Sequence, residues 1–383
     1  MTRDVTLILF VGGWGQCEVE RALDRAHRAA ARDLLDLLLR TGMVGRAVVA
    51  TDDAGWGDTL ADLPVEVDID PPGEPFHFGR RLAGLISRYG VECALCSGGA
   101  SAPLMRLDRW REILDRLRSS ERLVLANNLH SCDWVGFAPA MESAHLLAPE
   151  ANDNAIAWVL AHRGGLPHES LAPSAAARFD LDTPVDLLIV QRHPDVGPCL
   201  GRFLDGLGWE APWLDGVLEE MGRAGGSLAV VGRASSAAWA ALERATRCWV
   251  RVFAEERGMR ASGRQERGEV RSLLSDYVDL VGVDRLFDEL AELCGGVLFD
   301  NRVVLAARGL WPSAVDRFNS DLHRWDRVTE PFLRRFTRAA AEARVPVVLG
   351  GHSVVAGGLM ALLESFEAGA CSGEAQRVDD GVT

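Results

Sequence analysis

The first half of the chain alternates short apolar runs with amphipathic helical patterns. Val5–Val11 is a continuous apolar run, and a helical pattern from Glu18 to Arg40 follows it. Continuous apolar runs of this length are typical of strands buried on both faces, as in parallel sheets covered by helices. Further strands are expected at Arg46–Thr51, Glu66–Ile69, Cys93–Ser97 and Leu123–Ala126, and further helices at Phe78–Tyr89 and Arg109–Leu117. This βαβα order predicts an α/β fold with a mostly parallel sheet and helices on both faces.

The second half has a mainly helical pattern. Two short strands interrupt it, at Gly296–Ala307, with a hairpin turn about Asp300 and Asn301, and at Val345–Leu349. The expected helices are Ala237–Glu256, Glu269–Leu280, Val283–Leu293, Ala314–His323 and Pro331–Arg344. Proline and glycine cluster near His193–Pro198, so we predict an α/β domain over residues 1–195 and a mainly helical domain of unknown role over residues 196–383.

Charge and composition exclude several functions. The 383 residues carry a formal net charge of −14, which argues against nucleic acid and against an anionic membrane surface as partners. No lysine is present, so Schiff-base and P-loop lysine chemistry are excluded. The first apolar run has the length of a strand and cannot span a membrane, and the eight cysteines are scattered. We expect a cytoplasmic protein with free thiols, and a homodimer is one arrangement it could adopt.

A glycine-rich loop follows the first expected strand. Gly12, Gly13 and Gly15 would let backbone N–H groups approach a phosphate, and the helix after them would add its dipole. The spacing is not that of the dinucleotide fingerprint G-x-G-x-x-G. An ordinary strand-to-helix turn explains the glycines equally simply.

Two further loops at strand ends carry candidate ligand-binding residues. Gly98 and Gly99 leave room for a ligand after Cys93–Ser97, and Ser101 could donate a hydrogen bond to it; a tight loop is the alternative. After Leu123–Ala126 come Asn127, Asn128 and Asp133. The asparagines could contact a base or ribose and Asp133 could bind a metal, whereas the alternative is that these side chains cap the loop backbone.

A pair of aspartates marks the end of the first half. Asp180 and Asp182 alternate, so in an extended segment their carboxylates lie on one face, where they repel each other unless a cation binds between them. Thr183 and Pro184 form a good helix start, with Thr183 as the N-cap, and Asp186 fits the same capping role. Capping does not explain Asp180 or Asp182.

The run D-L-D-T-P-V-D-L at residues 180–187 resembles a segment of small-molecule nucleotidyltransferases. These are the MobA-like molybdenum-cofactor cytidylyl- and guanylyltransferases and the phospholactate guanylyltransferases. Asn154, in the run N-D-N-A before a helix, is similar to a nucleotide-side segment of the second group. The resemblance covers roughly residues 5–190.

This resemblance implies a Rossmann-like domain that binds a nucleoside triphosphate with Mg²⁺. Such a domain transfers the nucleoside monophosphate to a small phosphorylated acceptor and releases pyrophosphate. By position, Asp180 or Asp182 would be a metal ligand, and Gly12, Gly13 and Gly15 would line the triphosphate.

The chain departs from the family pattern at two positions. No lysine follows the glycine loop, where Arg21, Arg25 or Arg28 would have to supply the charge, and Gly98–Pro103 has no aspartate, for which Asp133 could substitute. A catalytically inactive nucleotide-binding sensor or scaffold is therefore one alternative. A nucleotide-sugar-dependent glycosyltransferase, whose D-x-D pattern Asp180 and Asp182 satisfy, is the other.

The second half offers two segments of interest. Arg251–Arg271 holds six arginines among glutamates and could bind an anionic acceptor or a partner domain, although a solvated helical face with internal ion pairs is the favoured interpretation. Gly350–Ser353 follows a strand, and its His352 could act as a general base or bind phosphate. A role for His352 beside a helix N-cap is the alternative.

Overall fold

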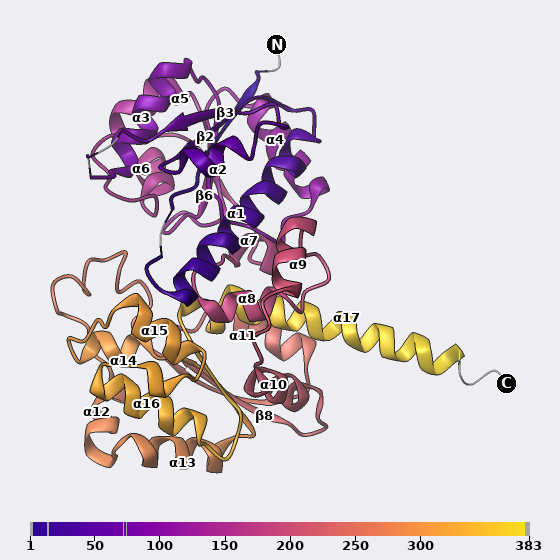
Figure 1. Ribbon diagram of the computed structural model, residues 1–383, viewed down its shortest axis with the longest axis vertical. Helices are drawn as coiled ribbons and strands as arrows, with labels where there is room; N and C mark the ends of the chain where they lie inside the picture. Colours follow the sequence, from indigo (N-terminus) through magenta and orange to yellow (C-terminus); the bar gives the residue numbers. More distant parts are fainter. Residues whose placement is uncertain (1–2, 14, 72, 74, 380–383) are drawn as a thin grey trace. The chain divides into compact units, whose positions relative to one another are not determined.

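The computed structural model describes residues 3–13, 15–71, 73 and 75–379 (Figure 1). The chain forms two compact units that are both discontinuous in sequence. Unit 1 comprises Met1–Trp14, Asp24–Asp180 and Gly197–Phe203, and unit 2 comprises Gly15–Leu23, Leu181–Val196 and Leu204–Thr383. The expected domain division at residue 195 stays a prediction.

Unit 1 is built on a mostly parallel sheet, as the sequence predicted. Within the described residues the sheet has seven strands in the order β3-β2-β1-β4-β6-β5-β7, and only β6 runs antiparallel to its neighbours. The strands are β1 (Val5–Phe10), β2 (Val44–Thr51), β3 (Glu66–Ile69), β4 (Ala94–Gly98), β5 (Leu123–Ala126), β6 (Trp134–Ala138) and β7 (His168–Ser170).

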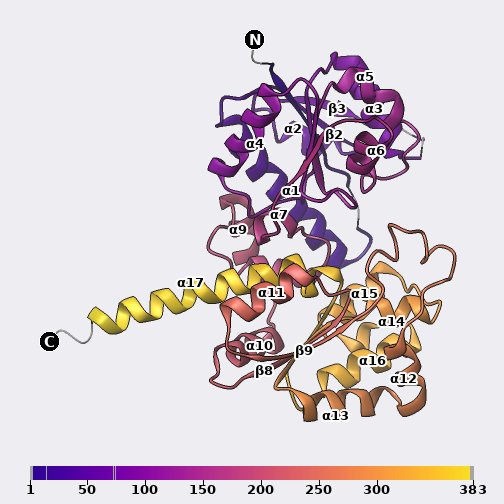
Figure 2. The same cartoon turned by 180° about the vertical axis from the view of Figure 1, so that it is seen from behind.

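Helices cover both faces of this sheet. Alternate residues of β1 enter different cores: Leu7 and Leu9 pack with one set of helices and Ile8 with the other. The first set is α1 (Glu18–Leu39), α2 (Ala54–Asp58) and α4 (Leu107–Ser119). The second set is α3 (Phe78–Tyr89), α5 (Ala140–Leu147) and α6 (Ile156–His162), and Figures 1 and 2 show α3, α5 and α6 on one side of the sheet and α4 on the other.

Helix α3 illustrates how local sequence sets these elements. Phe78, Leu82, Leu85 and Ile86 are buried and recur at helical spacing, so one stripe of the helix faces the sheet. The helix ends at Gly90, whose left-handed conformation (φ 60°) costs glycine little. The predicted bounds, Phe78–Tyr89, agree with the structure.

The strand order places a topological switch point beside β1. The chain leaves β1 through α1 toward β2, whereas it leaves the neighbouring strand β4 through α4 toward β5. Where two adjacent connections diverge in this way, a crevice opens at the carboxyl ends of the strands. Sequence analysis did not expect β6, whose residues follow directly on a polar loop, or the three-residue strand β7.

Unit 2 contains a parallel sheet that was only half expected. Among its described residues, four parallel strands lie in the order β11-β10-β8-β9. They are β8 (Ser227–Gly232), β9 (Trp249–Ala254), β10 (Gly296–Asp300) and β11 (Val347–Gly350). Helices still hold most of the unit, as predicted: α8 (Pro184–Val190), α10 (Pro212–Gly222), α11 (Ser236–Ala245), α12 (Leu273–Val281), α13 (Val283–Leu293), α14 (Arg302–Ala307), α15 (Ala314–Asp321), α16 (Pro331–Ala341) and α17 (Gly357–Asp379).

Two predictions for this unit are wrong. The expected hairpin at Gly296–Ala307 is one strand followed by helix α14, because parallel neighbours need a crossover and cannot be joined by a tight turn. The expected helix Ala237–Glu256 ends at Ala245, and Trp249–Ala254 forms an edge strand instead. Its β-branched and aromatic residues suit a pleated strand, and pairing with β8 overrides the weaker helical pattern.

The remaining helices are short. They are α7 (Ala175–Arg178) and α9 (Pro198–Asp205), with single 3₁₀ turns at Trp325–Arg327 and His352–Val355. In the part of the chain that the structure describes, no helix is both long and apolar enough to cross a membrane.

Candidate functional site

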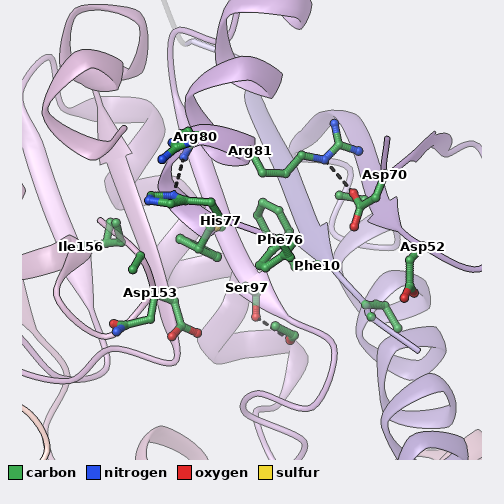
Figure 3. A pocket seen from close by; sticks show the side chains of 18 of the residues that line it. Phe10, Asp52, Asp70, Phe76, His77, Arg80, Arg81, Ser97, Asp153 and Ile156 are labelled. Carbon is green, nitrogen blue, oxygen red and sulfur yellow. Dashed lines mark hydrogen bonds and ion pairs between the residues drawn. The ribbon is translucent and has the colours of Figure 1, made fainter. Parts of the chain in front are cut away.

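A pocket of about 1080 Å³ opens at the carboxyl edge of the unit 1 sheet. The last residues of β1, β3 and β4, the end of β2 and the first residues of the antiparallel strand β6 line it. It therefore lies at the switch point beside β1, where this topology favours ligand binding. Figure 3 shows the pocket with Phe10 and Phe76 between Asp52 on one side and His77 and Arg80 on the other.

Some of the residues singled out from the sequence meet in this pocket, and others do not. Its lining includes Gly12, Gly13, Gly98 and Asp133. Unit 1 also contains, outside that lining, Gly99, Ser101, Asn127, Asn128, Asn154 and Asp180. Gly15 and Asp182 belong to unit 2. The roles expected for all of these residues stay predictions.

The glycine loop after β1 presents its backbone to the pocket. A side chain at Gly12 would meet nothing within 4 Å, so the space beside this residue is open. The Gly13 N–H already donates to Oδ1 of Asp52 at 2.6 Å. A phosphate could approach the loop beside Gly12, whereas the Gly13 N–H is already hydrogen-bonded to Asp52. Trp14, in the same loop, lies outside the described residues.

Gly99 has a packing role. A Cβ there would lie 2.8 Å from Val11 Cγ2 and 3.1 Å from the Ala31 Cβ, so only glycine lets this loop approach helix α1. The neighbouring Ser101 hydroxyl donates to the Asp133 carbonyl oxygen at 2.9 Å. Ser101 thus holds the two loops after β4 and β5 together, which favours the tight-loop alternative for this segment.

The arginines expected to replace the family's lysine are engaged elsewhere. Arg28 lies beside the glycine loop, but it pairs with Asp24 at 3.1 Å and with Asp53 at 2.7 Å. Arg25 lies over the Phe203 ring, and Arg21 donates to the Gln16 carbonyl oxygen at 2.9 Å. None of the three lines the pocket.

Helix α3 supplies the positive charge that the sequence analysis missed. Arg80 lines the pocket, is exposed, and has no carboxylate partner among the described residues. Its backbone N–H donates to Nδ1 of His77, the N-cap of α3, at 3.4 Å. The N-terminal turn of α3 and Arg80 therefore lie at the cavity (Figure 3), where a helix dipole and a guanidinium favour negative charge.

Arg81, one residue further along, has a structural role. Its guanidinium pairs with Asp70 at 2.7 Å and with Asp68 at 2.9 Å. Burial alone would raise the pKa of Asp68, but the Tyr89 hydroxyl and the Arg81 guanidinium hold it below its ordinary value. This network fixes α3 against the end of β3 and so positions Arg80.

The loop after β5 and the loop before α6 bring one carboxylate each to the opposite wall, Asp133 and Asp153. Asp133 accepts a hydrogen bond from the Asn127 amide, and the Asp133 N–H donates back to Asn127 Oδ1 at 3.0 Å. Asn127 therefore orients Asp133, as the capping alternative expected. Asp153 lines the same wall, and its carbonyl oxygen lies 3.2 Å from the Cys132 sulfur.

The thiols in the pocket wall are not nucleophiles. Burial raises the pKa of Cys132 to about 12 and that of Cys96 well above its ordinary value. Both are therefore protonated at neutral pH, and the protonated thiol is unreactive. The pocket's chemistry rests on its backbone amides, carboxylates and guanidinium.

The D-L-D-T-P-V-D-L segment divides between the two units. Asp180 pairs through its backbone with Ser101 in an isolated antiparallel bridge of unit 1. In unit 2 the Asp186 carboxylate accepts from the Thr183 N–H at 2.7 Å and from its hydroxyl at 2.9 Å, which confirms the interpretation of Thr183 and Asp186 as a helix cap. Asp182 is exposed, and its N–H donates to the same carboxylate at 3.1 Å.

Two pocket residues that the sequence did not single out follow the strands β2 and β3. Asp52 comes directly after β2, and Asp70 directly after β3. The rule that ligands bind at the carboxyl ends of parallel strands applies to these loops as it does to the others. Arg80 carried no such signal, because only the approach of α3 to the strand ends brings it to the pocket.

No protein-family model matches this sequence, and no curated protein matches it either. Solved structures match parts of the chain. A CMP:2-keto-3-deoxy-manno-octonic acid synthetase complexed with CTP matches at 11% identity with a TM-score of 0.36, covering 49% of this chain and 99% of that one. A 4-diphosphocytidyl-2C-methyl-D-erythritol synthase from Anaerococcus prevotii matches at 11% identity and a TM-score of 0.36, covering 49% and 95%.

A third solved structure is Rv0371c of Mycobacterium tuberculosis in complex with manganese. It matches at 18% identity with a TM-score of 0.33, covering 49% of this chain and 96% of that one. At these identities and TM-scores the three matches carry no argument about what the present chain does. The function of the present site has to be inferred from its own residues.

Proposed function

We propose that unit 1 is a nucleotidyltransferase that binds a nucleoside triphosphate with Mg²⁺ in the pocket beside β1. It would transfer the nucleoside monophosphate to a small phosphorylated acceptor. The observation that carries this proposal is the lining of the pocket, where Gly12, Arg80 and Asp133 face one cavity at a topological switch point. The resemblance of residues 180–187 to nucleotidyltransferases agrees with it.

The aromatic wall suits a nucleoside. Phe10 and Phe76 lie edge to face, with ring centroids 6.2 Å apart, and Phe76 is 59% exposed. An exposed ring beside a deep pocket gives a base a surface on which to stack, and such stacking is typically worth about 1–3 kcal/mol per base. The base would lie at this wall, and the phosphates would extend toward the helix α3 N-terminus.

The phosphates would be held by the backbone and one guanidinium. The open side of Gly12 admits a phosphate oxygen, and Arg80 supplies the cation that lysine supplies in the family pattern. In the transfer step an acceptor phosphate oxygen attacks the α-phosphorus, the bond from that phosphorus to the bridging oxygen breaks, and pyrophosphate leaves. Arg80 would stabilise the negative charge that develops on these oxygens.

The carboxylates are suited to a magnesium ion that shares its ligands with the substrate. Mg²⁺ is commonly bound through one or two carboxylates together with phosphate oxygens and waters. Asp133, oriented by Asn127, and Asp153 provide oxygen donors of this kind on the pocket wall. The ion would neutralise phosphate charge in the transfer step. Asp180 and Asp182 are not part of the pocket lining, so their role as metal ligands rests on the resemblance alone.

Nucleotide binding without transfer is the second candidate function, and Asp52 favours it. Its carboxylate occupies the Gly13 N–H and brings negative charge to the loop that would hold the triphosphate. A ligand with fewer phosphates tolerates that arrangement better than a triphosphate does.

Thermal unfolding with each of the four ribonucleoside triphosphates, with and without Mg²⁺, tests the proposal. A ligand at 100 times its dissociation constant stabilises the folded state by about 2.7 kcal/mol, which raises the melting temperature of a unit of this size by roughly 5–10 °C. We expect a metal-dependent rise for one base that is lost in Asp133→Asn. Pyrophosphate release in a screen of phosphorylated acceptors with that nucleotide then reports transfer.

The matched variants are Arg80→Gln and Arg111→Gln. Arg111 is exposed on α4, which packs on the other face of the sheet, so its loss should leave binding unchanged. Arg80→Gln should weaken nucleotide binding about tenfold, because charge-assisted hydrogen bonds contribute about 1.5–3 kcal/mol. A rise that needs no metal supports binding without transfer. No rise with any triphosphate refutes transfer from a nucleoside triphosphate, and no rise with the nucleoside diphosphates as well refutes nucleotide binding.

A further inference from the structure

Unit 2 has a switch point of its own. Strands β8 and β10 are parallel neighbours, but the chain leaves β8 through α11 toward β9 and leaves β10 through α14 and α15 toward β11 on the opposite side. In open parallel sheets, divergent connections of this kind favour ligand binding at the carboxyl ends of the strands, here those of β8 and β10. Charged residues gather at that edge.

Two buried ion pairs occupy the edge. Asp300, the last residue of β10, is fully buried and accepts from the Arg233 guanidinium, with Arg233 Nη2 3.0 Å from Asp300 Oδ1. Arg302 forms a bidentate ion pair with the fully buried Asp321, with Nη1 2.9 Å from Oδ1 and Nη2 2.6 Å from Oδ2. Burial would raise the pKa of Asp300, but the Arg233 guanidinium keeps it below its ordinary value. Each of these two carboxylates thus already forms an ion pair with one arginine.

Arg317 brings a further positive charge that makes no direct ion pair among the described residues. It projects from α15 within electrostatic range of Arg302 and Asp321 and lies over the Trp311 ring, 4.6 Å from its centroid. Its Nη1 atom is buried and has no hydrogen-bond partner within the described structure. Burial, with repulsion from Arg302 and Arg260, lowers the pKa of Arg317 to about 10, so the side chain is still charged at neutral pH.

Arg260 lies on the turn-rich loop after β9, which Figures 1 and 2 show beside α14 and α15. The helical face expected over Arg251–Arg271 is wrong, because β9 and this loop replace it. Internal ion pairs do form there, such as Arg264 with Glu256 at 2.7 Å. Arg260 is different: it is exposed, and no described carboxylate pairs with it.

We infer that Arg260 and Arg317 form a second ligand site, which binds the phosphate group of a small molecule at the carboxyl edge of the unit 2 sheet. Guanidinium groups held near one another repel unless an anion lies between them, and a phosphate oxygen would give the buried Nη1 of Arg317 its missing acceptor. The planar guanidinium group of arginine can donate two parallel hydrogen bonds to two oxygens of one phosphate group. The site is independent of the pocket in unit 1.

Isothermal titration calorimetry at constant ionic strength tests this site with two probes, inorganic phosphate and ribose 5-phosphate. The protein carries Arg80→Gln, which weakens the proposed unit 1 site. We expect one binding event, weakened about tenfold or more by Arg317→Gln and by Arg260→Gln. Arg260 is exposed, so its variant keeps the test valid even if Arg317→Gln does not fold.

Arg344→Gln is the matched control. Arg344 is exposed and lies between α16 and the start of β11, at the amino edge of the sheet. Its loss removes the same charge and should leave the affinity unchanged. Tighter binding of ribose 5-phosphate identifies an organic phosphate as the ligand, and equal affinities identify the phosphate group alone. Binding that is absent, or equally strong in every variant, overturns the inference.

Discussion

The buried carboxyl of Asp186 should make the stability of this protein fall as the pH rises from about 4 to about 7. Asp186 is fully buried beneath the first turn of α8, and burial raises its pKa from 3.8 to about 7. The nearby Asp182 adds to the rise, whereas hydrogen bonds from the Thr183 N–H and hydroxyl oppose it. Asp186→Asn removes the titration but keeps an oxygen acceptor for the Thr183 N–H.

The sign follows from proton linkage. Between about pH 4 and pH 7 the folded protein holds a proton on Asp186 that the unfolded chain has lost, so stability from this group is greatest at low pH and is lost as pH rises to about 7. Between about pH 5 and pH 7 the loss is roughly 3 kcal/mol, at about 1.36 kcal/mol for each pH unit. Above about pH 7 the loss is complete.

Urea unfolding followed by circular dichroism at several pH values measures the effect. Other groups titrate too, so the informative quantity is the difference in unfolding free energy between Asp186→Asn and the wild type. We expect this difference to favour the variant by roughly 3 kcal/mol more at about pH 9 than at about pH 5.

Asp205→Asn is the control for this experiment. Asp205 is exposed at the end of α9, so its difference from the wild type should not vary with pH. A pH-independent difference for Asp186→Asn as well would show that burial does not hold the proton on Asp186, and the reasoning would fail.

Two further predictions concern packing and charge. Gly99→Ala should lower the unfolding free energy by about 1–3 kcal/mol, because the added methyl group would lie 2.8 Å from Val11 Cγ2, whereas Gly12→Ala meets open space and should leave the melting temperature nearly unchanged. Asp300→Ala leaves the Arg233 guanidinium without its buried partner and should cost about 3–5 kcal/mol in urea unfolding; a cost below about 1 kcal/mol would mean that the pair is solvated.

The local pattern of the sequence predicted most of unit 1. The strands β3 and β5 and the helix α3 agree with the expected bounds, because continuous apolar runs and a stripe at helical spacing are properties of neighbouring residues. The capping of α8 by Thr183 and Asp186 was visible for the same reason. In unit 2 this reasoning missed β8 and replaced β9 with a helix, since an edge strand depends on the neighbour with which it pairs.

The candidate site, too, was predicted only in part from the sequence, and the tertiary structure decided the rest. The sequence alone placed Gly12, Gly13, Gly98 and Asp133 at strand ends, and the order of the strands brings them to one pocket. Only the tertiary structure shows that Arg80 lines the pocket without an ion-pair partner among the described residues. Arg28, which is closer to the glycine loop in the sequence, forms ion pairs with Asp24 and Asp53 instead.

A charged side chain is available to a ligand only where no other side chain of the protein already forms an ion pair with it. Arg81 pairs with Asp68 and Asp70, which precede it by 13 and 11 residues, and Arg302 pairs with Asp321 across 19 residues. Arg80 and Arg317 have no such partner in the described structure, although nothing in their local sequence sets them apart. Residue spacing determined most of the helices and strands of unit 1, whereas the packing of those elements decided which charges are neutralised and which are left for a ligand.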